Sequence, residues 1–194
     1  MAGRPAKIAR VRELAVVCIP KNGNSSIKRA LLRGVGVKPP WDEHGLHRHP
    51  SLNLGADPEG RYTAAFLRHP AARLVSCWAD KICRDRGRST RHLVMLGFRV
   101  GMGFPAFARH ATRVSNRDVH LRPQSDFLPK RLDFIGRVET LDRDWARLQE
   151  RFPWLPDIGR YNETVRGAWE PHCDAETLRV IQAHYSEDWR LCGL

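Results

Sequence analysis

A short apolar run followed by a polar, glycine-containing loop constrains this chain most. The run is Leu14-Ala-Val-Val-Cys-Ile19, and Pro20 ends it. Unbroken apolar runs of this length are typical of strands that are buried on both faces. The loop Lys21-Asn-Gly-Asn-Ser25 then leads into a predicted helix over Ser26–Arg33, with Gly34 as its stop. A strand, a loop and a helix in this order indicate an α/β fold.

The same alternation continues along the chain. Tyr62–Leu67 is typical of a second strand, and Pro70 can begin a helix that runs from Ala71 to about Arg84. A third strand is predicted over Phe134–Arg137, and residues 35–60, rich in Pro, Gly and His, are expected to be irregular. Further helices are predicted within Arg91–Val100, over Pro105–Ala111, over Leu141–Phe152, and after Asp174 as one long helix carrying Leu178, Ile181 and Tyr185. We therefore expect a P-loop-like, mostly parallel central sheet flanked by helices.

Length and composition set limits on the class of protein. The 194 residues fit a single domain over 1–194, and 42% hydrophobic residues are enough for a core. No stretch has the roughly 18 apolar residues of a membrane span, and no secretory signal follows the basic segment Met1–Arg12. The 5 cysteines form neither a zinc-site spacing nor a disulfide pattern, so we expect a cytoplasmic protein without a bound metal.

The net charge favours an anionic partner. It is +12, and the segment Arg84–Arg122 contains arginines but no lysine or glutamate. Nucleic acid, a membrane surface and phosphorylated or sulfated ligands all attract such a protein.

The loop after the first strand is a candidate anion site. It lies past the carboxyl end of a strand, where open α/β sheets bind ligands. Its small residues allow backbone N–H groups to approach an anion, the helix contributes its positive end, and Lys21 adds a full charge. Ser25 and Ser26 offer hydroxyl donors, or either is the N-cap of the helix. A Walker-type ATPase is disfavoured, because its lysine follows the glycines whereas Lys21 precedes Gly23.

A second candidate anion site follows the second strand. Arg68 stands at the end of that strand, and Ser76 lies inside the helix begun by Pro70. Arginine offers a planar set of donors suited to phosphate, and a hydroxyl can add another hydrogen bond. Two such sites suit a ligand with two separated anionic groups.

Here the sequence resembles the PAPS-dependent sulfotransferases, in particular the carbohydrate (Golgi-type, family 2) branch. PAPS is 3′-phosphoadenosine-5′-phosphosulfate, and PAP is the nucleotide left after transfer. Residues 19–26 resemble the family's 5′-phosphosulfate loop, and residues 66–81 resemble its 3′-phosphate motif R-[DE]-P-x-x-R-L-x-S. Residues 120–124 and 133–141 are similar to its H-x-R-P-Q and D-F-I-G-R-x-E-x-L blocks, and residues 185–189 to its Y-x-x-D-[FW] ending. The matches cover most of the chain in the family's order.

The resemblance implies a fold, a reaction and a set of site residues. The fold would be that of the sulfotransferases, with residues 84–132 as a mainly helical or irregular acceptor-side region. Lys21 would stabilise the leaving phosphate of PAPS, and Arg68 and Ser76 would hold its 3′-phosphate. The 5′-phosphate would be bound by Asn22, Gly23, Asn24, Ser25 and Ser26. No metal is required for this chemistry, because a lysine and backbone donors can stabilise the leaving group.

The reaction also needs a base near the acceptor hydroxyl. By resemblance to the uronosyl sulfotransferases, whose base lies in an H-x-H at this point of the chain, His49 is the first candidate and His47 the second. His120 of the H-x-R-P-Q block is the rival, with Arg122 and Gln124 orienting the acceptor. An equally good role for that block is to brace the sheet.

The chain departs from the family in two ways, and one alternative class remains. His69 replaces the usual acid after the arginine, and the chain lacks the membrane anchor of the Golgi enzymes, so we expect a cytosolic relative. The alternative is a non-catalytic protein that binds nucleic acid or another polyanion, with Trp41, Trp78 or Phe104 stacking on bases. The acceptor, whether a carbohydrate or another small-molecule hydroxyl, is not encoded in any motif, and neither is the oligomeric state.

Overall fold

The computed structural model describes residues 7–83, 88–159, 161 and 168–194. The chain divides into two compact units. Unit 1 comprises Met1–Leu67 with Asp126–Asn162, and unit 2 comprises Arg68–Ser125 with Glu163–Leu194. The expectation of one domain over residues 1–194 stays a prediction, and the predicted acceptor-side region begins at residues that lie outside the described ones, 84–87.

Unit 1 is built on a four-stranded sheet with the order β1-β2-β3-β4. Its strands are β1 (Ile8–Val11), β2 (Leu14–Val17), β3 (Tyr62–Leu67) and β4 (Phe134–Arg137). The last two have the predicted bounds, and β2 ends two residues before the end of its apolar run. β1 was not predicted: it is a four-residue strand that pairs antiparallel with β2 through a tight turn in which Arg12 has a φ of 51°.

The pairing of the strands decides where their loops emerge. β2 pairs with β3 and β3 with β4 in parallel, with Val17 opposite Ala65 and Leu67 opposite Arg137. The carboxyl ends of these three strands therefore lie at one edge of the sheet. This confirms the mostly parallel sheet, with the antiparallel β1 as an added edge strand.

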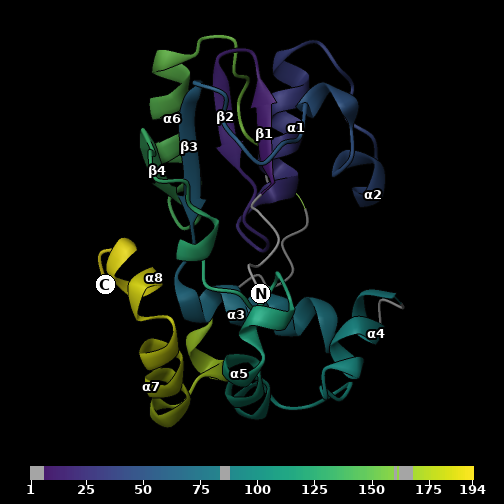
Figure 1. The fold of residues 1–194 in the computed structure, drawn as a ribbon, viewed down its shortest axis with the longest axis vertical. Helices are drawn as coiled ribbons and strands as arrows, with labels where there is room; N and C mark the ends of the chain where they lie inside the picture. Colours follow the sequence, from purple (N-terminus) through teal and green to yellow (C-terminus); the bar gives the residue numbers. More distant parts are fainter. Residues whose placement is uncertain (1–6, 84–87, 160, 162–167) are drawn as a thin grey trace. The chain divides into compact units, whose positions relative to one another are not determined.

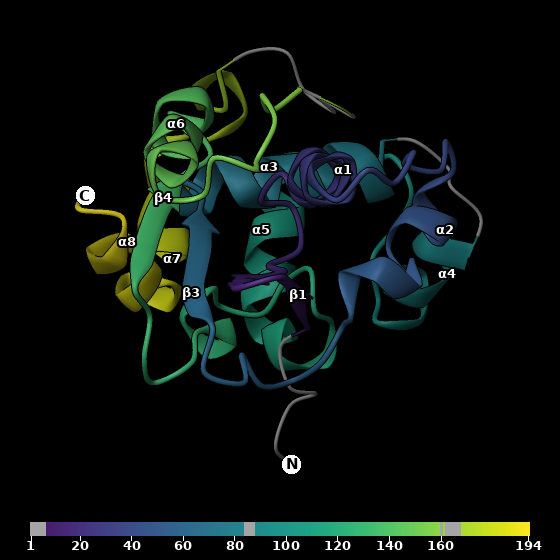
Figure 2. The same cartoon turned by 90° about the horizontal axis from the view of Figure 1, so that it is seen from above.

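Two helices of unit 1 cover one face of this sheet, α1 (Asn24–Gly34) and α6 (Leu141–Arg151). Leu14, Val16 and Phe66 of the sheet pack with Leu31 and Trp145 of these helices in one apolar cluster, and Figures 1 and 2 show both helices beside the strands. Every residue of β2 is buried, as its unbroken apolar run predicts. The sheet is thus flanked by helices as expected.

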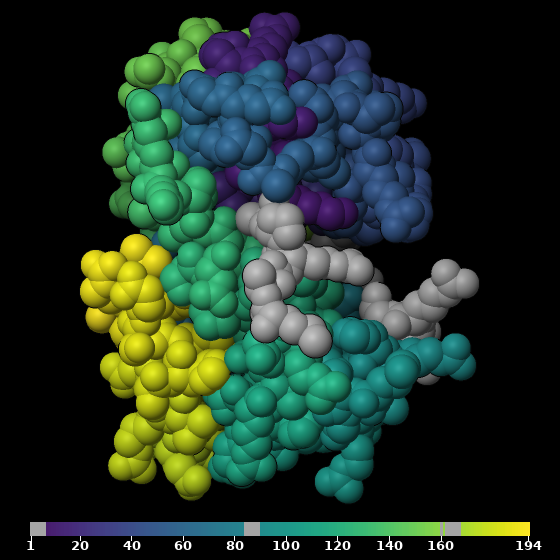
Figure 3. Space-filling model, viewed as in Figure 1, coloured from purple at the N-terminus to yellow at the C-terminus, as the bar shows by residue number. Residues whose placement is uncertain are grey.

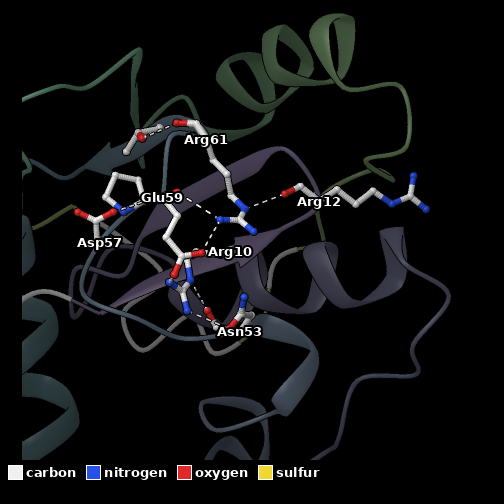
Figure 4. A network of polar contacts seen from close by, with 8 residues as sticks. Arg10, Arg12, Asn53, Asp57, Glu59 and Arg61 are labelled. Atoms are coloured by element: carbon white, nitrogen blue, oxygen red, sulfur yellow. Dashed lines mark hydrogen bonds and ion pairs between the residues drawn. The ribbon is translucent and has the colours of Figure 1, made fainter.

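The segment between α1 and β3 is less irregular than predicted. It contains α2 (Glu43–Leu46) and the short 3-10 helix η1 (Pro50–Leu52). Arg10 of β1 fixes it by hydrogen bonds from Nε and Nη2 to the backbone and side chain of Asn53 at 2.8 and 2.9 Å, and by an ion pair with Glu59. Arg61 joins the same network through Glu59, at 2.8 Å (Figure 4). The long loop is therefore held to the edge strand by polar contacts.

Unit 2 is helical, with α3 (Pro70–Lys81), α4 (Arg88–Met95), α5 (Phe104–Arg113), α7 (Ala175–His184) and α8 (Ser186–Leu191). It also has the 3-10 helices η2 (Ser115–Arg117) and η4 (Glu170–His172), while η3 (Ser125–Phe127) lies where the chain passes into unit 1. Side chains of α3, α4, α5 and α7 form one apolar cluster. The surface of α7 and α8, near the end of the chain, is yellow in Figure 3.

The end of the chain differs from the single long helix that was predicted. Asp174 is the N-cap of α7 as expected, since its side chain accepts the Thr177 N–H at 2.7 Å. The helix ends at His184, however, and α8 begins as a separate helix. Tyr185 stands between them with φ −104° and ψ 33°, and its hydroxyl donates to the backbone oxygen of Leu121 at 2.6 Å. This buried hydrogen bond fixes the break, and the helical periodicity gives no sign of it.

Candidate functional site

The loop after β2 has an unusual backbone. Lys21 is a non-glycine residue in the left-handed region, with a φ of 70°, and Gly23 has a φ of 73°. A non-glycine residue in this region costs roughly 1–2 kcal/mol, and such strained residues cluster at functional sites. Gly23 is the N-cap of α1 and has no side chain with which to cap the helix. The first N–H groups of a helix have no partner within it, so this helix presents donors and a positive dipole end to an anion.

The same loop is fixed to the neighbouring strand. The Nδ2 of Asn22 donates to the backbone oxygen of Phe66 at 2.7 Å, and the Asn22 side chain is buried. Phe66 lies in β3, two residues before Arg68. The predicted 5′-phosphate loop is therefore tied to the strand that leads to the predicted 3′-phosphate residue.

Ser25 and Ser26 lie in the first turn of α1, and both have partners in unit 1. The Ser25 hydroxyl donates to Oε2 of Glu43 at 2.6 Å, and the Ser26 Oγ accepts the Tyr161 N–H at 3.0 Å. Neither serine is the N-cap, which removes the purely structural role that the sequence left open for them. The Ser26 hydroxyl can therefore still donate a hydrogen bond to another group, whereas the Ser25 hydroxyl already donates one to Glu43.

In unit 2 the backbone of Arg68 is held by Gln124. The Gln124 side chain accepts the Arg68 N–H at 2.9 Å and donates to the Arg68 backbone oxygen at 2.8 Å. Gln124 is fully buried, so this two-point contact acts where water does not compete. Gln124 was predicted to orient the acceptor or brace the sheet; the structure shows it in contact with the backbone of Arg68, one residue after β3, and both roles stay predictions.

Two further buried side chains hold the segment that contains Gln124. Asp188 of α8 accepts the N–H groups of Gln124 and Ser125 at 2.7 and 2.8 Å. Arg73 of α3 donates to the Arg122 backbone oxygen at 2.8 Å. Burial lowers the pKa of the Arg73 guanidinium, and the neighbouring Tyr185 and Asp188 oppose this shift. Residues 118–125 are therefore fixed by hydrogen bonds from two helices.

The histidines that were predicted as bases differ in their hydrogen bonds. His47 has both ring nitrogens engaged: Nδ1 with Lys28 Nζ at 3.1 Å and Nε2 with Glu43 Oε2 at 3.1 Å. Burial and the Lys28 charge lower the pKa of His47 to about 4, although Glu43 acts in the opposite direction. His49 is the N-cap of η1, and its Nδ1 accepts the Ser51 N–H at 3.3 Å.

His120 lies in unit 2, beside a buried carboxylate. Its Nδ1 is 2.8 Å from Asp118 Oδ1, and the same oxygen accepts the His120 backbone N–H at 2.7 Å. His92 of α4 contacts the other oxygen, Oδ2, at 3.2 Å. Burial acts to raise the pKa of Asp118, but the hydrogen bonds and charge of His120, aided by His92, hold that pKa below its ordinary value.

Comparison with known proteins identifies the family. A model described as the sulfotransferase family matches residues 4–191 of the chain. The chain belongs to the sulfotransferase family. No curated protein matches the chain, and no solved structure matches it either.

The contacts above join residues from three of the segments that resemble motifs of the sulfotransferase family. The second arginine of the 3′-phosphate motif, Arg73, and the two fixed residues of the terminal motif, Tyr185 and Asp188, all contact the segment with the H-x-R-P-Q block. Residues far apart in the sequence are thus parts of one structural unit.

The departure of this sulfotransferase from the family pattern at His69 has a visible consequence. The His69 ring stacks on Trp169 at a centroid distance of 4.4 Å and meets the edge of Trp189 at 4.8 Å. Aromatic packing surrounds the position where the family has an acid. Ser76, the other predicted 3′-phosphate residue, lies in α3 and is 4% exposed.

Several polar residues of the sulfotransferase were not singled out from the sequence. Glu43 and Lys28 surround His47, and Asp118 orients His120. The spacing of Glu43 and His47, four residues apart, was the one local signal for the first contact. Among the described residues, no three His, Cys, Asp or Glu side chains are grouped to hold a metal ion. No helix in the described part of the chain is long and apolar enough to cross a membrane.

Proposed function

We propose that this sulfotransferase transfers the sulfuryl group of PAPS to an acceptor hydroxyl. The observation that carries the proposal is the loop after β2, where a left-handed Lys21 precedes a helix with a glycine N-cap at the carboxyl edge of the parallel strands. The family match supplies the reaction class. The loop supplies donors of the kind that a 5′-phosphosulfate needs.

Binding of the donor would use both ends of the nucleotide. The N–H groups of Gly23–Ser26 and the ammonium of Lys21 would hold the 5′-phosphosulfate. Arg68, whose backbone is fixed by Gln124, would hold the 3′-phosphate together with Ser76. The fixed backbone supports this role, because a side chain on a rigid anchor loses less freedom on binding.

The chemistry of transfer is mainly electrostatic. Negative charge builds on the oxygen that leaves the sulfur, and Lys21 would donate a hydrogen bond to that oxygen. Donors that are already oriented toward developing charge are the largest single source of catalysis in comparable group transfers. A histidine would accept the proton of the acceptor hydroxyl, the candidates being His49, His47 and His120.

The acceptor side and the compartment are part of the same proposal. Residues 84–132 would shape the acceptor site, and their arginines favour an acidic acceptor such as a uronate or a sulfated sugar. The structure describes all 5 cysteines of the chain and places none of them in a disulfide, which supports the proposal of the reducing cytoplasm.

Titration calorimetry with PAP tests the proposal. We expect saturable binding that weakens at least about tenfold in Lys21→Ala and in Arg68→Ala, the loss typical of a charged hydrogen bond. Lys38→Ala, a lysine outside the predicted sites, is the matched control and should bind as the wild type does. Binding that ATP and heparin share equally, and that falls steeply with salt in all variants, would support a polyanion-binding protein instead.

The aromatic residues that would stack on bases give little support to a protein that binds nucleic acid. Trp78 and Phe104 pack against each other at a centroid distance of 5.7 Å, and the Trp78 Nε1 donates to the Met102 oxygen at 2.7 Å. Of the three aromatic residues, Trp41 alone is largely exposed, at 86%. A screen of hydroxyl acceptors with ³⁵S-labelled PAPS would then identify the substrate of the enzyme.

A further inference from the structure

The three candidate bases do not all carry their proton on the same ring nitrogen. A neutral histidine has one N–H donor and one unprotonated nitrogen, and the unprotonated one is the acceptor of a proton in catalysis. The hydrogen bonds of each ring therefore decide whether it is arranged as a base.

His47 and His49 are not arranged in this way. Lys28 Nζ donates to Nδ1 of His47 at 3.1 Å, and the Nε2–H then points at Glu43. Both nitrogens of His47 are therefore committed to neighbours. The Nδ1 of His49 accepts the Ser51 N–H, so its neutral ring carries the proton on Nε2. Each ring has its unprotonated nitrogen turned toward the protein's own donor.

His120 has the opposite arrangement. Asp118 is 7% exposed, and its pKa lies below the ordinary value, so it is a carboxylate and can only accept. The Nδ1 of His120 must then donate to Asp118 Oδ1, which leaves Nε2 unprotonated. The His120 side chain is 31% exposed, whereas its partner is buried. A buried carboxylate that fixes the tautomer of a half-exposed histidine is the arrangement that general bases use.

The surroundings make this orientation rigid. The Asp118 backbone oxygen accepts the N–H groups of Leu121 and Arg122 at 3.0 and 3.1 Å. Tyr185 holds the Leu121 oxygen, and Gln124, four residues after His120, holds the backbone of Arg68. The His120 ring therefore lies on the same segment of unit 2 that holds the backbone of Arg68, the predicted 3′-phosphate residue.

We propose that His120 is the catalytic base of this sulfotransferase and that Asp118 is its positioning residue. The inference rests on the proposed function. As the acceptor oxygen bonds to sulfur, the bond between sulfur and the 5′-phosphate oxygen breaks, and its electron pair stays on PAP. The proton of the acceptor hydroxyl passes to Nε2 of His120, and Asp118 stabilises the imidazolium that forms.

The first test measures the tautomers directly. Long-range ¹H–¹⁵N correlation spectra of the full-length wild-type protein at neutral pH, assigned by single histidine substitutions, report which ring nitrogen is protonated. We expect His120 as the Nδ1–H form, and His47 and His49 as Nε2–H forms. His120 in the Nε2–H form would overturn the proposal.

The second test measures turnover and binding separately. Release of PAP from PAPS, with the acceptor from the labelled screen, should fall about 10²–10⁴-fold in His120→Ala, the usual contribution of a general base. Asp118→Asn keeps the side-chain shape and removes the charge, and it should lower kcat at least about tenfold. The Kd for PAP should stay within about threefold of the wild type in both. Imidazole added to His120→Ala should restore part of the rate.

The results of these tests distinguish the assignment of His120 as the base from the proposed sulfotransfer itself. His44→Ala, at an exposed histidine of α2, is the matched control and should turn over as the wild type does. If His49→Ala or His47→Ala loses more turnover than His120→Ala while PAP still binds, the assignment of the base is wrong and the sulfotransfer stands. If the wild type neither binds PAP nor consumes PAPS, the proposed function itself fails.

Discussion

The left-handed backbone at Lys21 predicts that this position trades stability for function. A side chain in that region costs about 1–2 kcal/mol, whereas glycine adopts it freely. Lys21 has a φ of 70°, so glycine would relieve the strain. Glycine also loses more backbone entropy on folding, by about 0.5–1 kcal/mol relative to alanine. The net expectation is that Lys21→Gly is about 1 kcal/mol more stable than Lys21→Ala.

The pair of variants isolates this effect. Both remove the ammonium and the lysine stem beyond Cβ, so they abolish the same side-chain interactions and differ in the backbone conformations they favour. For a chain of this size, about 1 kcal/mol corresponds to about 2–4 °C in Tm, which differential scanning calorimetry resolves. PAP affinity should fall to the same extent in both. A Lys21→Ala protein that is as stable as Lys21→Gly, or more stable, would refute the strain at this residue.

Two other predictions follow from polar contacts of Asp188 and His47. Asp188→Asn should lower the free energy of unfolding by about 2–4 kcal/mol, because one of the two N–H groups that the buried Asp188 accepts would then face an amide N–H₂ instead of an oxygen. Urea unfolding checks this, with the exposed Glu187→Gln as control, and a loss below about 0.5 kcal/mol would contradict it. The pKa of His47 is lowered to about 4 in the folded protein. Between pH 4 and about 6.5, the unfolded chain therefore binds a proton that the folded chain does not. The free energy of unfolding falls as the pH drops through this window. Because 39% of the His47 side chain is exposed, solvent screening reduces this loss of stability to about 1 kcal/mol. Urea unfolding at pH 7 and pH 4.5 should show a smaller loss in His47→Asn than in the wild type. An equal loss in both proteins would refute the lowered pKa of His47.

Much of the fold was predictable because the decisive signals are local. The bounds of β3 and β4 follow from apolar runs, and Asp174 is recognisable as a cap by its residue type. β1 was missed because four residues beside a basic segment carry no clear period, and its strand is fixed by pairing with β2. The break at Tyr185 was missed because a contact 64 residues away creates it.

Candidate site residues could be named from the sequence, but their contacts could not. The loop, the arginine and the histidines stand in recognisable motifs, so their positions were available from sequence. The tautomer of each histidine depends on neighbours that no motif includes, such as Lys28 beside His47 and Asp118 beside His120. The contact of Gln124 with Arg68 likewise depends on a partner 56 residues away.

The central claim is that one nucleotide is held by its two phosphates at two separate positions of the chain. Titration calorimetry with adenosine 5′-monophosphate and adenosine 3′-monophosphate tests each position alone. Lys21→Ala should weaken the 5′-monophosphate at least about tenfold and leave the 3′-monophosphate within about threefold, and Arg68→Ala should do the reverse. If both variants weaken both monophosphates equally, the protein is a basic surface for anions in general, and the account of a two-ended PAPS site is wrong.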